Sequence, residues 1–155
     1  MINIINKDDS ITGVCLECHF VNSKDKLIRK WLPKKITKQK IKWGILPPHF
    51  SLFLNRSVYE KLGLFDLKSG NIGLDSKWLL NLINIENLNI RILKNYSVIM
   101  ELGGTSTGSL KNILIAYKNI ALEAKQLGFS NWFILPLIKI LSKTNQFLLI
   151  QQRKE

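Results

Sequence analysis

Alternating apolar and polar positions predict a β-strand over residues 11–21. One set of alternate positions in that segment is apolar throughout, namely Val14, Leu16, Cys18 and Phe20. A period of two places these side chains on one face of a strand. Three shorter apolar runs, at residues 50–54, 90–92 and 98–100, predict further strands, the last two as separate pieces around a turn at Lys94–Asn95.

Apolar residues at helical spacing predict a long helix in the second half of the chain. Gly128 ends this run, which consists of Leu110, Ile113, Leu114, Tyr117, Ala121, Ala124 and Leu127. A further helical stretch is predicted over residues 131–151, with Pro136 near its start.

Two shorter helices are predicted between the strands. Ser57 and Glu60 fit a capping box, and Gly63 stands where such a helix would end. Residues 74–83 are also expected to be helical, with Asp75 in the first turn, where the helix dipole favours a carboxylate. Four side chains near these helices are expected in the core: Phe53, Tyr59, Leu62 and Phe65.

The order of these elements predicts an α/β protein. We expect a few strands of mixed direction, flanking helices and a C-terminal helical segment. At 155 residues the chain can bury one core, which we place in a domain over residues 1–130, followed by an amphipathic, basic helical tail over residues 131–155. Cys15 and Cys18 are expected to be buried on opposite faces of the first strand, and a disulfide scaffold needs more cysteines.

The chain is strongly basic, with a formal net charge of +12 at pH 7. Nine basic residues and one acidic residue lie between Lys24 and Lys42, and Pro33 lies inside this stretch, so we expect an irregular excursion. The stretch could be a solvated loop, or it could attract nucleic acid, anionic lipid or a diphosphate. Lys outnumbers Arg 19 to 4, which disfavours a reader of nucleic acid, because Arg recognises base edges better.

No apolar segment of the sequence indicates a membrane span. The N-terminus carries no signal-peptide pattern, and the apolar stretch over residues 132–150 is interrupted by Pro136, Lys139 and Lys143. We therefore expect a cytoplasmic protein. The basic stretch and the helical tail could hold it peripherally at the inner membrane face, or the tail could pack on a partner chain.

Joined motifs in the middle of the chain are its most informative feature. They read Gly44-x-x-Pro47-Pro48-His49-x-x-x-Phe53-x-x-Arg56-x-x-Tyr59-x-x-Leu62-Gly63-x-Phe65-Asp66, then Gly73-Leu74-Asp75-x-x-x-Leu79, then Gly103-Gly104-x-Ser106. In order and spacing, over residues 40–127, the chain resembles the C-terminal, acceptor-side half of bacterial family-2 glycosyltransferases, especially those that build surface polysaccharides. The resemblance implies a partial GT-A fold. It also implies transfer of a sugar from a nucleotide-sugar donor to a surface-polysaccharide or lipid-linked acceptor.

The resemblance implies roles for individual residues. Asp75 matches the family's catalytic base, which deprotonates the acceptor hydroxyl as that oxygen attacks the anomeric carbon with inversion. His49 matches a histidine near the donor diphosphate and the acceptor cleft. Gly103, Gly104 and Ser106 precede a helix N-terminus, where free amides can receive an anion. On spacing alone, these residues also fit a helix-start carboxylate, a packed loop histidine and an ordinary cap.

The nucleotide-binding half of such enzymes, with its metal-binding Asp-x-Asp motif, has no counterpart in the sequence, and Asp8 and Asp9 are not assigned as metal ligands. We expect no cofactor on this chain alone, a divalent metal (Mg²⁺ or Mn²⁺) in the complete enzyme, and a truncated or split transferase that is inactive alone. The implied partners are a nucleotide-sugar, a saccharide acceptor and a separately encoded N-terminal half. The alternative is a non-enzymatic basic module that binds nucleic acid or an anionic membrane.

Overall fold

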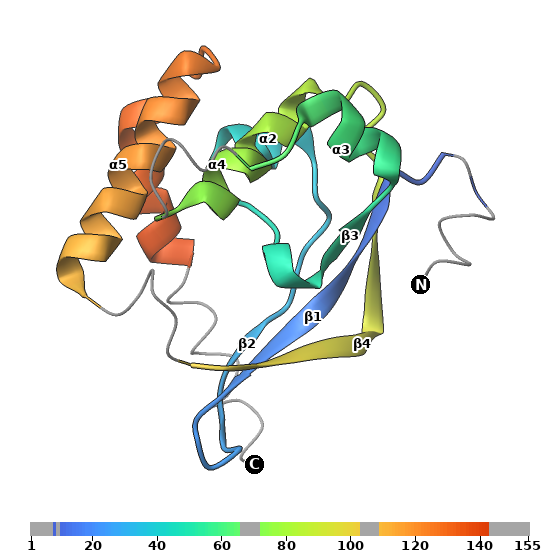
Figure 1. Ribbon diagram of the computed structural model, residues 1–155, viewed down its shortest axis with the longest axis vertical. Coiled ribbons are helices and arrows are strands. Elements are labelled where there is room, and N and C mark those ends of the chain that lie inside the picture. Colours follow the sequence, from blue (N-terminus) through green and yellow to red (C-terminus); the bar gives the residue numbers. More distant parts are fainter. Residues whose placement is uncertain (1–7, 9, 66–71, 103–108, 143–155) are drawn as a thin grey trace.

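A four-stranded mixed sheet is the centre of the fold in the computed structural model, which describes residues 8, 10–65, 72–102 and 109–142. Strand β1 (Gly13–Val21) pairs antiparallel with β2 (Leu27–Trp31) and β3 (Leu52–Leu54), and parallel with β4 (Ile90–Glu101). Figure 1 shows the helices gathered on one side of these strands. The predicted α/β class, with strands of mixed direction, is confirmed.

Strand β4 differs from its prediction as two separate pieces. It is one strand of 12 residues, and its register shifts once, because Leu16 pairs with Leu93 while the next residue, Glu17, pairs with Ser97. Residues 94–96 therefore form a bulge at the place of the predicted turn. The partner strand keeps the chain extended on both sides of the bulge.

The prediction of an irregular basic excursion is wrong. Its first part is β2, joined to β1 by a tight turn in which Asp25 has a φ of 55° and the Asn22 side chain accepts hydrogen bonds from two backbone amides. Its later part includes helix α2 (Lys38–Lys42), whose N-terminus is capped by the Thr37 side chain. Ile41 of this helix is fully buried, so the basic stretch is held to the domain by an apolar anchor.

Helix α3 (Arg56–Leu62) begins two residues earlier than predicted. Its N-cap is Asn55, so the capping box at Ser57 and Glu60 does not form. The Asn55 amide instead donates to the backbone carbonyl oxygen of Ile11 at 2.9 Å, which ties the helix start to the chain just before β1. Gly63 is the C-cap with a φ of 76°, as predicted.

Two of the other predicted helices are confirmed. Helix α4 (Leu74–Leu80) continues as a 3₁₀ turn, η3 (Asn81–Asn84), with Asp75 in its first turn. Helix α5 (Leu110–Gln126) starts at Ser109, whose hydroxyl accepts from the Asn112 amide, and Gly128 follows its end with a φ of 74°. Both ends therefore match the capping chemistry of the sequence.

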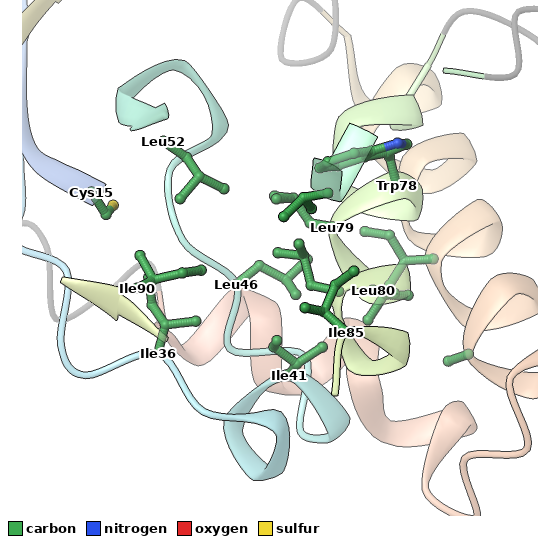
Figure 2. Packing of buried hydrophobic residues seen from close by; sticks show 14 of the residues in the cluster. Cys15, Ile36, Ile41, Leu46, Leu52, Trp78, Leu79, Leu80, Ile85 and Ile90 are labelled. Atoms are coloured by element: carbon green, nitrogen blue, oxygen red, sulfur yellow. The ribbon is translucent and has the colours of Figure 1, made fainter. Parts of the chain in front are cut away.

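The core lies between β1 and helices α2, α4 and α5 (Figure 2). Cys15 packs in this cluster, Cys18 is equally buried outside it, and burial raises the pKa of their thiols to about 11 and about 12. The prediction of buried strand cysteines is confirmed. Among the four side chains expected in the core, Tyr59 and Leu62 are partly buried against it, whereas Phe53 and Phe65 are exposed.

The described part of the predicted tail packs on the domain. It consists of η4 (Trp132–Ile134) and a helix over residues 135–142. Leu135 is fully buried and lies against Gly44, where an added Cβ would come within 3.2 Å of the leucine side chain. The Asn131 amide donates to the carbonyl oxygen of Lys42 at 3.0 Å. Among the described residues, no helix is long and apolar enough to cross a bilayer.

Candidate active site

A cavity of about 400 Å³ lies where the sheet, α4, α5 and the helix over residues 135–142 meet. Its walls include four aromatic side chains, Phe20, Trp31, Phe50 and Tyr117. Its charged side chains and its histidine come from five separate segments: Arg29, His49, Asp75, Glu101 and Lys139. An apolar cavity with a few convergent polar groups is the usual form of a small-molecule site.

Helix α4 places Asp75 at this cavity. The residue before the helix, Gly73, has a φ of 79° and lies so close to α5 that an added Cβ would be 3.1 Å from the Cα of Ala116. The Asn119 amide of α5 donates to the carbonyl oxygen of Ile72 at 2.9 Å. The start of α4 is therefore fixed against α5, and Asp75 is fixed with it.

His49 reaches the cavity from the other side, at the start of the 3₁₀ turn η1 (His49–Ser51). This turn is tied to the sheet because the buried Ser51 hydroxyl donates to the carbonyl oxygen of Leu16 at 2.9 Å. The imidazole also makes a T-shaped contact with the Phe50 ring, with 4.8 Å between the ring centroids.

The structure brings His49 and Asp75 into contact. His49 Nδ1 lies 3.1 Å from Asp75 Oδ2, and the two side chains remain 45% and 35% exposed. Burial by itself would raise the pKa of Asp75, but the hydrogen bond and charge of His49, the charge of Lys139 and the backbone amide of Ser76 outweigh it and lower the pKa to about 2. Asp75 is therefore an ionised carboxylate at neutral pH.

Lys139 is a site residue that the sequence analysis did not single out. Its ammonium group donates to the Ser76 hydroxyl, and that hydroxyl lies 3.5 Å from Asp75 Oδ2. Lys139 stands four residues after the buried Leu135, which puts both on one helical face. That spacing is the signal that could have located Lys139, once Leu135 was recognised as a core residue.

Arg29 was seen in the sequence only as part of the basic stretch. In the structure it lies on β2 opposite Phe20, with its guanidinium 3.8 Å above the centre of that ring, and both residues line the cavity. The position of the guanidinium over the face of the ring is a cation–π contact.

Gly103, Gly104 and Ser106 lie outside the described residues. The neighbouring part of β4 reaches the cavity through Glu101. Among residues 8, 10–65, 72–102 and 109–142, no group of three or more His, Cys, Asp or Glu side chains gathers to hold a metal. The divalent metal of the complete enzyme stays a prediction.

No protein-family model, curated protein or solved structure matches the chain. The case for a function therefore rests on the residues of the cavity and on their geometry.

The lowered pKa of Asp75 predicts an acid-sensitive contribution to stability. The pKa is about 2 in the folded protein against an ordinary 3.8, so the stabilisation is complete above pH 4 and is lost as the pH falls through 2. We expect Asp75→Asn to cost about 1 kcal/mol at pH 6, a small value because solvent screens this partly exposed carboxylate. Urea unfolding at pH 6 and pH 2.5 measures it.

The control for this prediction is Glu60→Gln, which changes an exposed carboxylate on α3 that pairs with Arg56. Its effect on stability should be close to zero at both pH values. If Asp75→Asn loses as much free energy of unfolding at pH 2.5 as at pH 6, the effect does not have an electrostatic origin.

Proposed function

We propose that this chain is the acceptor-side half of a GT-A glycosyltransferase, which transfers a sugar from a nucleotide-sugar donor to a surface-polysaccharide or lipid-linked acceptor. The observation that carries the proposal is the contact between His49 Nδ1 and Asp75 Oδ2 at 3.1 Å inside the cavity. These two residues belong to different motifs of the family resemblance. Two motifs that meet at one cavity with an acid–base pair are what an acceptor site requires.

The remaining walls of the cavity also suit a sugar. Trp31, Phe50 and Tyr117 offer flat apolar faces on which the C–H groups of a pyranose can pack. Arg29 and Glu101 add hydrogen-bonding groups for hydroxyls. In the proposed reaction, the His49–Asp75 pair removes the proton of the acceptor hydroxyl, while the nucleotide and its divalent metal are held by a nucleotide-binding half outside the described residues.

Saccharide binding tests the proposal directly. The chain has two histidines, so isotope-labelled histidine gives two sets of imidazole signals in an NMR spectrum. We expect the signals of His49 to shift on titration with an oligosaccharide panel, because His49 lines the cavity, while those of His19 stay in place. Asp75→Asn should weaken the binding.

His49→Gln assigns the two signals. A panel of surface-polysaccharide fragments that leaves His49 unmoved at millimolar concentration would count against an acceptor site. A shift caused by DNA that vanishes with added salt would instead favour the basic nucleic-acid module.

A contact with a membrane surface is the second candidate function. Phe133, Leu137 and Leu141 follow one another at intervals of four residues and are 64%, 57% and 57% exposed. Such spacing gives the C-terminal segment one apolar face that points to solvent. An apolar helical face on a protein of charge +12 is suited to the surface of an anionic bilayer.

Liposome flotation tests this second function. We expect the protein to float with anionic vesicles and less with neutral ones, because both apolar burial and charge contribute. The double variant Leu137→Gln and Leu141→Gln should reduce the bound fraction several-fold.

A control is Ile99→Gln, which changes an apolar residue on β4 that is 68% exposed, somewhat more than the two leucines. Equal flotation of the double variant and the control, or no flotation with either vesicle, would exclude the proposed helical contact.

A further inference from the structure

The contact between His49 and Asp75 favours one position for the proton of the imidazole. Asp75 Oδ2 is the oxygen of a carboxylate and lies 3.1 Å from His49 Nδ1, so its charge attracts a proton on Nδ1 and would repel a lone pair at that nitrogen. A neutral imidazole that carries its proton on Nδ1 has its lone pair on Nε2. Among the described residues, no hydrogen bond of the protein occupies Nε2.

Asp75 itself is poorly suited to take a proton. The charge of Lys139 and the backbone amide of Ser76 favour its charged form whether or not His49 is protonated, and a carboxylate of ordinary pKa is already a weak base at neutral pH. A general base is most effective when its pKa lies near the working pH. An imidazole is the side chain whose ordinary titration falls in that range.

We propose that Nε2 of His49 is the atom that accepts the proton of the acceptor hydroxyl, and that Asp75 is a positioning residue that acts through His49. This inference rests on the glycosyl transfer proposed above and names the group that performs its proton transfer. It moves the role of base from the carboxylate to the imidazole.

The proton and the electrons balance in a single displacement. The acceptor oxygen forms a bond to the anomeric carbon of the nucleotide-sugar as its O–H bond breaks and the proton moves to His49 Nε2. The bond from the anomeric carbon to the diphosphate oxygen breaks, and the nucleoside diphosphate leaves with that electron pair. His49 is then an imidazolium beside the Asp75 carboxylate, which offsets its charge until the proton passes to water.

The surroundings of His49 keep the ring in this orientation. The edge-to-face contact with Phe50 restrains rotation of the ring. The other charged or titratable side chains that line the cavity are Arg29 on β2, Glu101 on β4, Tyr117 on α5 and Lys139 on the C-terminal segment.

The first measurement determines which tautomer His49 adopts. Nitrogen NMR of histidine-labelled protein at pH 8, without any substrate, distinguishes a ring nitrogen that bears a proton from one that does not. We expect a proton on Nδ1 and none on Nε2 of His49, and a change of tautomer populations in Asp75→Asn. A dominant Nε2–H tautomer, or an imidazolium with both nitrogens protonated, would overturn the proposal.

A second measurement follows the reactivity of Nε2. Diethyl pyrocarbonate acylates neutral imidazole, and His19→Gln removes the second target. We expect His49 to react readily and more slowly in Asp75→Asn, because without the carboxylate the neutral ring divides between its two tautomers and less of it has a lone pair on Nε2. Equal rates in the two proteins, or no reaction at His49, would refute the assignment.

Neither measurement needs a saccharide, so the two proposals can fail separately. If the tautomer and the reactivity are as expected but no saccharide binds, the assignment of the imidazole–carboxylate pair stands and the proposal of glycosyl transfer is rejected. If saccharides bind but His49 has the opposite tautomer, the proposal of a transferase stands and the role of general base returns to Asp75.

Discussion

Replacing His49 with glutamine is expected to lower the proposed glycosyl transfer by a factor of about 10²–10⁴, the usual contribution of a general base. The reason is that glutamine keeps a polar side chain beside Asp75 but has no nitrogen that can accept a proton at neutral pH. Asp75→Asn should fall in a similar range, because an imidazole that loses its carboxylate partner adopts the wrong tautomer. Release of nucleoside diphosphate, from the chain co-expressed with the nucleotide-binding half of a family-2 transferase, measures both rates.

The control is His19→Gln, which changes the only other histidine of the chain. His19 lies on β1 beside Glu17 and does not line the cavity, so its replacement should leave the rate unchanged. Turnover by His49→Gln at the wild-type rate, with Asp75→Asn inactive, would show that Asp75 acts on the hydroxyl without the imidazole.

The elements that the sequence predicted correctly are those determined by residues close together in the chain. Helix α5 has a long apolar period, a serine cap and a glycine end within one segment. The structure keeps the helix, its cap and its end, although Leu110 and Leu114 of the apolar period are exposed. The bulge at residues 94–96 of β4 could not be predicted in the same way, because the extended path on both sides is maintained by pairing with β1. The start of α3 likewise depends on a residue far away in the sequence, because the Asn55 amide donates a hydrogen bond to the carbonyl oxygen of Ile11.

In the candidate site, too, some features follow from local sequence motifs and others depend on how distant segments pack. Asp75 and His49 stand out in the sequence because each lies in a motif, but their contact depends on how η1 and α4 pack, which no local pattern encodes. Arg29 and Lys139 look like ordinary members of basic segments, and only the placement of β2 and of residues 135–142 brings them to the cavity. Charged residues on amphipathic elements are usually solvent-exposed, so the charge of these two residues does not by itself predict a place at the cavity.

Replacing Leu80 with alanine is expected to destabilise the protein by about 2–5 kcal/mol. Leu80 is fully buried in the core cluster, so the change removes apolar contacts and leaves a cavity that the neighbouring side chains fill only in part. Much of the free energy of unfolding would be lost, since a small domain has only about 5–15 kcal/mol in total. Equilibrium unfolding in urea, followed by circular dichroism, measures the difference.

Leu114→Ala is the matched control, because it removes the same atoms from a leucine of α5 that is 68% exposed. Its effect should stay within about 0.5 kcal/mol, as for surface substitutions in general. The two variants delete the same side-chain atoms within helices, so the gap between them measures burial at Leu80. Equal losses in both variants would mean that α4 does not pack where the structure places it. Because α4 also carries Asp75, that outcome would remove the structural basis of the candidate site as well.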